Sequence, residues 1–111
     1  MIKRTKYRNC KVKINQSTYD SKKEARRGEE LKLLERASVI QNLRFQVPFE
    51  LIPPQRDSEN KAIRACKYIA DFVYQDGDKT IIEDSKGMKT KEYLIKKKLM
   101  LFVHGIEILE S

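Results

Sequence analysis

The sequence predicts one domain of the mixed α+β class, with its elements in the order helix, strand, strand, strand, helix, strand. Three observations lead to this order: amphipathic segments at residues 21–37 and 90–103, alternating apolar and polar side chains between them, and a short apolar segment at 106–109. At 111 residues, the chain has the length of a single domain. We expect residues 1–10 to form a basic arm and residues 11–111 to form the domain.

The charge of the chain indicates a polyanionic partner. The formal net charge is +8, and the basic residues cluster within residues 1–13, 22–27 and 96–98. Clustered lysine and arginine side chains bind nucleic acids because they release the counterions condensed on the phosphates. An inert solvated face or contact with an anionic membrane surface would account for the same charge, and we weigh nucleic acid above both.

Cysteine, histidine and hydropathy argue against several classes of protein. The two cysteines, Cys10 and Cys66, and the one histidine, His104, suggest neither a disulfide framework nor a zinc site, so we interpret the cysteines as ordinary thiols. The first residues of the chain are too polar for a signal peptide, and the longest apolar run, 99–103, is too short to span a bilayer. We therefore expect a cytoplasmic protein without membrane contact.

The first helix is predicted from residue 21 to about residue 37. Ser21 and Glu24 fit a capping box, which assigns Glu24 a purely structural role. Glu24 also shares a face with Gly28 and Leu31, so it heads the inward stripe of the helix and can contribute to a site as well. Gly28 is expected where the helix approaches the sheet closely.

Three further segments are predicted from local patterns. Residues 43–51 alternate without a fault, which predicts a half-buried antiparallel strand, and Pro48 restricts this strand to a sheet edge or a bulge. Residues 55–61 are polar and show no periodicity, so we predict a flexible loop there. Two short runs, 11–14 and 17–19, predict a small hairpin ahead of the first helix.

Two strands at the centre of the chain carry charges among apolar neighbours. The first strand alternates, so Asp71 is expected on the same face as Ile69 and Val73. In the second strand, Asp84 and Lys86 are expected on one face, together with an isoleucine. Buried charges are costly without partners, which makes these residues candidates for a functional site.

The turn between these strands fixes their register. If residues 76–79 form a four-residue loop, Tyr74 pairs with Ile81 and Asp71 lies opposite Asp84, with Cβ atoms about 5 Å apart. Two carboxylates at that separation repel each other strongly unless a hard cation lies between them. The register therefore predicts a metal site on the hairpin.

The second helix is predicted from Thr90, which can cap it, to about Val103. Its inward stripe is expected to consist of Ile95, Leu99 and Phe102. Another face is expected to carry Tyr93, Lys96 and Lys97. A closing strand at 106–109 should direct both of its isoleucines inward.

These residues include the groups that a metal-dependent phosphodiesterase needs. Asp71 and Asp84 would hold Mg²⁺, the backbone carbonyl of Ser85 would add a ligand, and Glu24 would bind the metal directly or through water. Lys86 would orient the attacking water or stabilise the negative charge that develops on the phosphate. The expected cofactor is Mg²⁺, for which Mn²⁺ can substitute, and we expect no nucleotide cofactor.

A surface ion cluster is the simplest alternative for the three hairpin charges, Asp71, Asp84 and Lys86. A second alternative is that Glu83, rather than its neighbour, is the functional acid. The residue two positions after Glu83 is Ser85, whereas Asp84 is followed two positions later by a lysine. The pair of Asp84 and Lys86 therefore fits the expected chemistry better.

Three blocks of the sequence resemble the PD-(D/E)xK nuclease superfamily: residues 19–27, 68–72 and 83–87. More closely, they resemble small phage-encoded members that are similar to Holliday-junction resolvases. The resemblance covers roughly residues 11–109 and departs from the superfamily pattern at Ala70, where a proline is expected. It implies a restriction-endonuclease-like αβββαβ core with a mixed central sheet flanked by two helices.

The resemblance implies a Mg²⁺-dependent, structure-selective DNA endonuclease, such as a phage Holliday junction resolvase, acting as a homodimer on branched DNA in the host cytoplasm. The catalytic residues would be Glu24, Asp71, Asp84 and Lys86. The residues expected to contact DNA are Lys22, Lys23, Arg26, Arg27, Lys89, Tyr93, Lys96 and Lys97. A DNA-binding module that has the nuclease fold without catalysis is the main alternative, and a small basic scaffold protein is a third.

Overall fold

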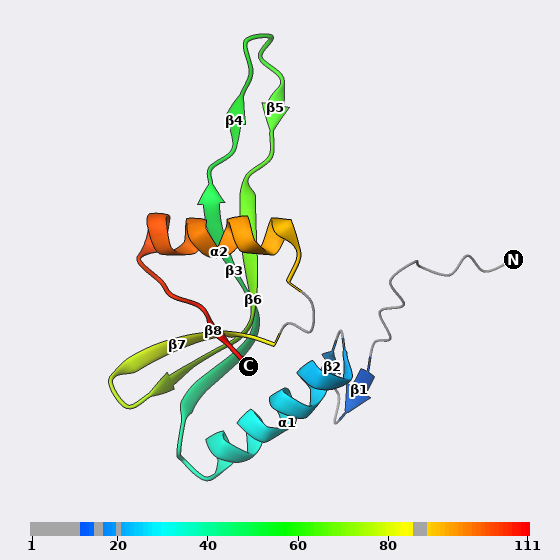
Figure 1. The fold of residues 1–111 in the computed structure, drawn as a ribbon, viewed down its shortest axis with the longest axis vertical. Coiled ribbons are helices and arrows are strands. Elements are labelled where there is room, and N and C mark those ends of the chain that lie inside the picture. The colour runs from blue at the N-terminus through cyan, green and yellow to red at the C-terminus, as the bar shows by residue number, and fades with distance from the viewer. Residues whose placement is uncertain (1–11, 15–16, 20, 86–88) are drawn as a thin grey trace, which may run out of the picture.

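The computed structural model describes residues 12–14, 17–19, 21–85 and 89–111 (Figure 1). The core elements are α1 (Lys22–Arg36), β3 (Gln41–Ile52), β6 (Cys66–Asp76), β7 (Lys79–Asp84), α2 (Lys91–His104) and β8 (Leu109–Glu110). The strands form one sheet in the order β3-β6-β7-β8, antiparallel except for the parallel pair β7 and β8. The predicted mixed α+β fold and its order of elements are therefore confirmed. The basic arm predicted at residues 1–10 lies outside the described residues.

Two small two-stranded sheets accompany this core. The antiparallel pair β1 (Val12–Ile14) and β2 (Ser17–Tyr19) confirms the predicted hairpin before α1. The second pair, β4 (Gln55–Arg56) and β5 (Ala62–Ile63), lies where the sequence predicts a flexible loop. The prediction for residues 55–61 is wrong, because Gln55 and Arg56 pair with Ile63 and Ala62 across a tight turn instead of remaining irregular.

Helix α1 is capped and packed as its sequence predicts. The Ser21 Oγ accepts a hydrogen bond from the Glu24 backbone nitrogen at 3.1 Å, and Ala25, Gly28 and Leu31 are buried. A Cβ atom at Gly28 would lie 2.5 Å from a ring carbon of Tyr19 on β2. The glycine therefore permits a close approach, but the neighbour is the small β1-β2 sheet rather than the central one.

Strand β3 confirms the predicted alternation and its edge position. Its residues alternate between half-buried and exposed from Leu43 to Glu50, and β3 is the outer strand of the sheet. Leu43 and Phe45 pack against the core beneath α1, whereas Val47 and Phe49 pack against the core beneath α2. The strand therefore serves two hydrophobic clusters, one at each end.

Strand β6 also packs against both hydrophobic clusters, one at each end. Tyr68, Ala70 and Val73 belong to the cluster beneath α2, whereas Phe72 and Tyr74 belong to the cluster beneath α1. Even-numbered residues of β6 face α2 as far as Ala70, whereas an odd-numbered residue, Val73, faces it further along. The side of β6 that is turned toward α2 therefore changes around Asp71.

This change of face corrects one prediction about Asp71. Ile69 is 52% exposed, whereas Val73 is buried, so these two residues do not share an apolar face with Asp71 as strict alternation predicts. The alternation rule assumes a strand that keeps the same face toward the core along its length.

Helix α2 is rotated relative to the prediction. Its buried residues are Tyr93 and Met100, and Leu99 packs at the edge of the core. The predicted inward residues Ile95 and Phe102 are 58% and 87% exposed. The tyrosine, which sequence reasoning placed on another face, is the inward residue because its hydroxyl donates to Glu110 Oε2 at 2.6 Å. Among the described residues, no helix is both long and apolar enough to cross a membrane.

The closing strand is shorter and later than predicted. It consists of Leu109–Glu110, whereas the prediction placed it at 106–109. The two isoleucines of that segment do point inward: Ile108 is buried and Ile106 packs against the same cluster. The chain end thus packs its apolar side chains before it pairs with β7.

Candidate functional site

The register of the central hairpin brings the two predicted aspartates together. Tyr74 pairs with Ile81, as predicted, and this register continues to the pair Phe72 and Glu83. Asp71 and Asp84 are the next residues of the two strands, so continuing the same register by one residue sets them opposite each other. The loop is tighter than predicted, because Asp76 and Lys79 also pair and Gly77, with φ +64°, makes the turn.

Asp71 and Asp84 are both held in a buried environment. They are 7% and 0% exposed, respectively. One Asp71 oxygen accepts a hydrogen bond from the backbone nitrogen of Ser85 at 2.9 Å. Asp84 Oδ2 accepts a hydrogen bond from the hydroxyl of Tyr68 at 2.5 Å. Burial, and then this bond to the carboxylate, raise the pKa of Tyr68, so the phenol stays protonated and remains a donor to Asp84.

The amide of Gln46 links Glu24 to one of the two aspartates, Asp71. Its side chain is on α1 and is 4% exposed, which agrees with the prediction that it heads the inward stripe. The Gln46 side-chain nitrogen lies 3.1 Å from Glu24 Oε2 and 3.5 Å from Asp71 Oδ1. The structure thus connects the predicted carboxylates from α1 and β6, while β7 contributes Asp84.

Gln46 is a residue of this site that sequence reasoning missed. The alternation of β3 marks it only as one more polar residue on the solvent side. Its backbone has φ +53°, a left-handed conformation that is uncommon for a residue other than glycine. It lies between Phe45 and Val47, where β3 changes from one hydrophobic cluster to the other. Local strand irregularities of this kind often re-aim a side chain beside a functional site, and no sequence pattern in the strand signals this one.

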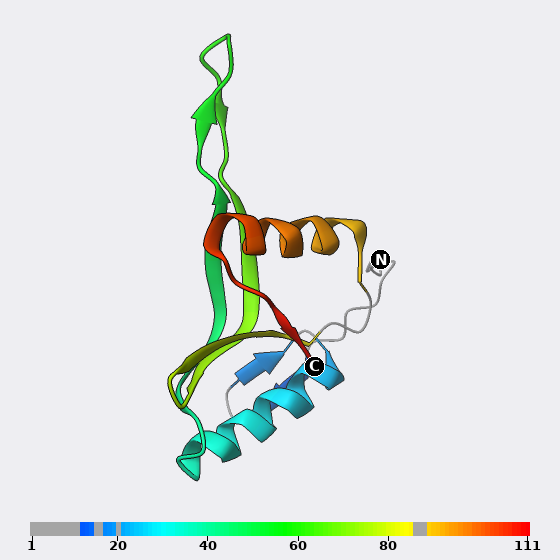
Figure 2. The same cartoon turned by 60° about the vertical axis from the view of Figure 1, so that its left-hand side comes forward.

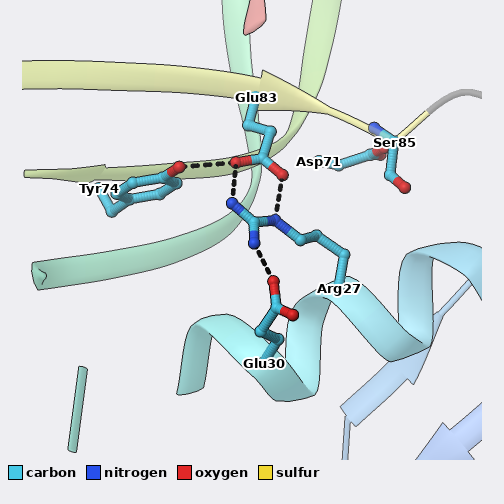
Figure 3. A network of polar contacts seen from close by, with 6 residues as sticks. All are labelled: Arg27, Glu30, Asp71, Tyr74, Glu83 and Ser85. Carbon is cyan, nitrogen blue, oxygen red and sulfur yellow. Dashed lines mark hydrogen bonds and ion pairs between the residues drawn. The ribbon is translucent and has the colours of Figure 1, made fainter. Parts of the chain in front are cut away.

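Glu83 has a different environment from its neighbour Asp84, as Figure 3 shows. Its carboxylate points toward α1, where Arg27 donates to both of its oxygens, at 2.6 Å and 3.1 Å. The Tyr74 hydroxyl donates to one of these oxygens at 2.6 Å, and Arg27 also contacts Glu30. Glu83 is therefore a member of a buried ion-pair network that attaches α1 to the sheet.

The pKa directions agree with this interpretation. Burial by itself raises the pKa of Glu83, but the hydrogen bonds from Arg27 and Tyr74 outweigh burial, and the pKa is lowered. Burial and the bond to Glu83 raise the pKa of Tyr74 to about 12. Glu83 is thus a structural carboxylate, and the choice of Asp84 over it on the basis of sequence fits the geometry.

The remaining two predicted site residues have separate outcomes. Ser85 is 5% exposed and follows Asp84 at the end of β7. Lys86 lies outside the described residues, so its predicted role stays a prediction. Among the residues that the structure describes, no group of three or more histidine, cysteine, aspartate and glutamate side chains is arranged to hold a metal ion.

The residues predicted to contact DNA from α1 lie on its outer side, with one exception. Lys22, Lys23 and Arg26 are exposed, and two of them, Lys22 and Arg26, line a surface hollow of about 660 Å³ beside α1. Arg27 is only about a quarter exposed and binds Glu83. Its position suits a structural role, and its contact with DNA stays a prediction.

Three of the four predicted DNA contacts on and before α2 converge on one acid. Lys89 and Lys97 form ion pairs with Glu110 at 2.9 Å and 3.1 Å, and Tyr93 donates to the same carboxylate. The hydrogen bond from Tyr93, followed by that from Lys89, lowers the pKa of Glu110 to about 2. Lys96 is half-buried on the same helix. Tyr93, Lys97 and the preceding Lys89 therefore attach α2 to β8, and DNA contact by all four residues stays a prediction.

The fold and the buried carboxylates define an α+β domain with an acidic site at the centre of its sheet. A family model described as a protein of unknown function, DUF1064, matches residues 4–105, so the chain belongs to this family. No curated protein and no solved structure matches the chain.

Proposed function

We propose that this protein is a metal-dependent DNA endonuclease whose site comprises Asp71, Asp84 and Glu24. The observation that carries the proposal is the placement of two buried aspartates opposite each other on neighbouring strands, with the amide of Gln46 linking one of them to Glu24. Burying carboxylates in this arrangement costs stability, and a functional role accounts for that cost better than a surface ion cluster, because the side chains are not on the surface.

The donor set suits a hard divalent cation. Asp71 and Asp84 offer carboxylate oxygens, the ligand type that Mg²⁺ prefers, and Glu24 and the backbone carbonyl of Ser85 are the predicted additional ligands. The hydroxyl oxygen of Ser85 is buried and has no hydrogen-bond partner among the described residues, so a polar group at this position remains available. When bound, Mg²⁺ or Mn²⁺ would polarise the phosphate and lower the pKa of an attacking water.

Neighbouring residues of the protein hold the carboxylates in position. The Tyr68 hydroxyl holds one Asp84 oxygen, and the Ser85 backbone nitrogen holds one Asp71 oxygen, so each carboxylate has a fixed orientation. Gln46 fixes the position of Glu24 relative to Asp71. In the proposal, Lys86 orients the water or stabilises the charge on the phosphate, and the exposed basic side chains of α1 bind the DNA backbone.

The proposed substrate is branched DNA, cut by a homodimer in the cytoplasm, as in a phage Holliday junction resolvase. The net charge of +8 and the exposed lysines of α1 support a polyanionic substrate. Selectivity for a junction would require two sites at a fixed separation, and a homodimer supplies this geometry.

The test is cleavage of labelled four-way junctions, flaps, nicked duplexes and plain duplexes with Mg²⁺, with Mn²⁺ and with chelator. We expect the wild type to cut with either metal and to stop with chelator. Asp84→Asn and Lys86→Ala should lower the rate by at least about 100-fold, because the first removes a proposed metal ligand and the second removes the group that orients the water or stabilises the charge on the phosphate. If both variants cut as fast as the wild type, the assignment of the site is wrong.

A DNA-binding module without catalysis is the second candidate function. It is favoured by the finding that no three metal-ligating side chains are grouped within the described part of the chain. It predicts salt-sensitive DNA binding that is unchanged in Asp71→Asn and Asp84→Asn, with no cleavage under any metal condition.

A further inference from the structure

The ribbon, defined here as residues 53–65 with β4 and β5, extends directly from the central sheet. Ile52 pairs with Cys66 at its base, and Gln55 with Ile63 further out, so one register runs from the sheet into the ribbon. Pro53 and Pro54 lie between these pairs, and they lack the backbone donors needed to continue the ladder. Both views show the ribbon projecting past α2, away from the rest of the chain (Figures 1 and 2).

The ribbon contributes nothing to either hydrophobic cluster, yet its tip is well bonded. Every residue from Ile52 to Arg64 is exposed. Asp57 Oδ1 accepts from the backbone nitrogens of Glu59 and Lys61 at 2.8 Å and 2.9 Å, and Arg56 donates to the Asn60 carbonyl at 2.8 Å. An isolated two-stranded hairpin is marginally stable, so a protruding one with a bonded tip indicates a surface role.

The two faces of the ribbon differ in charge. Because Arg56 pairs with Ala62 and side chains alternate along each strand, one face carries Pro54, Arg56, Ala62 and Arg64. This face, which we call the arginine face, has two cations, two small side chains and no acid. Asp57 bonds to Lys61 through the backbone at 3.0 Å and lies with it on the opposite face. Asp57 is therefore kept away from the arginine face.

We propose that the arginine face of the ribbon binds duplex DNA in the major groove. The major groove of B-form DNA is about 12 Å wide and admits a two-stranded β-ribbon. Arginine suits this position because its guanidinium pairs bidentately with phosphate oxygens or with guanine. The small side chains of Pro54 and Ala62 leave both guanidiniums as the most prominent groups on that face. Prolines at the base also hinder edge pairing with another sheet, which disfavours a strand-exchanged protein partner.

The ribbon lies within about one turn of a DNA duplex from the acidic site. Arg56 lies ten residues along the chain from Gln46, which is at most about 33 Å at the rise of an extended strand. One turn of B-form DNA is about 34–36 Å. The inference rests on the proposed function only in this respect: a duplex cut at Asp71 and Asp84 would meet the ribbon within about one turn of the cut.

The experiment measures binding separately from cleavage. Binding of a fluorescent duplex of about 24 base pairs is measured by anisotropy without metal, at several salt concentrations, in an Asp84→Asn background. Arg56→Ala/Arg64→Ala should weaken binding about tenfold or more and reduce the salt slope by about two, one for each lost phosphate contact. The matched control, Lys61→Ala/Lys67→Ala, removes two exposed positive charges that lie off the arginine face, Lys61 on the ribbon and Lys67 at the start of β6, and should change affinity less than about twofold.

The outcomes separate this inference from the proposed function. Equal loss in the two double variants, or no loss in either, overturns the ribbon inference, even if the wild type cleaves DNA. A selective loss in the arginine variant supports it, even if the wild type cuts nothing, in which case only the proposed function fails. Light scattering on the same variants provides a further check: if losing the arginines converts a dimer to a monomer, the face binds a second copy and the inference is wrong.

Discussion

Glu83 and Asp84 are adjacent residues of β7, both 0% exposed, and they occupy opposite sides of the strand. Glu83 faces α1, where an arginine and a tyrosine hydroxyl bind it. Asp84 is held by the hydroxyl of Tyr68 and lies opposite another carboxylate, Asp71. A buried acid that has its own arginine contributes to the fold. A pair of buried acids set against each other, by contrast, suits a cation supplied from outside.

The largest effect is expected where the structural acid loses its cation. Arg27→Met leaves Glu83 charged and buried, and we expect the free energy of unfolding to fall by about 3 kcal/mol, near the low end for buried pairs because the arginine is partly exposed. Urea unfolding measures this loss. The control is Arg26→Met, at the neighbouring exposed position, which should stay within about 0.5 kcal/mol of the wild type. Equal losses in the two variants would contradict the structural role of Glu83.

The hydroxyl of Tyr74 should contribute the next largest effect, and this effect should depend on pH. Because the pKa of Glu83 is lowered in the folded state, its contribution is present above the ordinary value of 4.5 and is lost as the pH falls through the folded-state pKa. Tyr74→Phe should cost about 1.5–2 kcal/mol at pH 7, as expected for a hydrogen bond to a charged group, and less at about pH 3.

Urea unfolding at these two pH values checks the prediction for Tyr74. In a Glu83→Gln background, Tyr74→Phe should lose this pH dependence. If the dependence persists there, Glu83 is not its source.

The next prediction concerns the acidic site, through the backbone of Gln46. At φ +53°, a glycine is tolerated better than an alanine, so Gln46→Gly should be about 1 kcal/mol more stable than Gln46→Ala. At Arg44, a paired position of the same strand, alanine should be the more stable replacement. Thermal unfolding of the four variants gives both differences. The same order at both positions would show that Gln46 is not strained in solution.

The last prediction concerns Glu110, the β8 residue paired with Asp84. Its pKa should be about 2, because Tyr93 donates to it and two lysines adjoin it. The resulting stabilisation is present above pH 4.5 and is lost as the pH falls toward 2. A titration of the side-chain carbonyl by NMR measures the pKa directly, and Tyr93→Phe should raise it. An ordinary value in the wild type would show that these contacts do not form.

The fold could be predicted from sequence where local signals agreed with the tertiary structure. Ser21 and Gly28 defined α1, and the turn at Gly77 set the register that places Asp71 opposite Asp84. The face of α2 could not be predicted, because its apolar residues surround much of the helix and a hydrogen bond from Tyr93 to distant Glu110 selects the buried side. The ribbon was missed because its paired segments are only two residues long and no apolar alternation marks them.

The acidic residues of the site could be predicted from the sequence, but the residues around them that hold the structure in place could not. Glu24, Asp71 and Asp84 were identified because charges among apolar neighbours are conspicuous. Gln46 was not, because its role depends on a left-handed backbone and on a change of face in β3. Arg27 was assigned to DNA from its basic cluster, although its partner Glu83 is 56 positions away and no local pattern connects the two.

Calorimetric titration with Mg²⁺ and Mn²⁺ tests most directly whether the two acids of β7 differ as proposed. The wild type should bind metal, Asp71→Asn and Asp84→Asn should lose most of that binding, and Glu83→Gln should bind as the wild type does while being less stable to urea. Because Asp84→Asn and Glu83→Gln each remove one charge from adjacent buried residues, they form a matched pair. Metal binding that is lost in Glu83→Gln but kept in Asp84→Asn would contradict the assignment of the site.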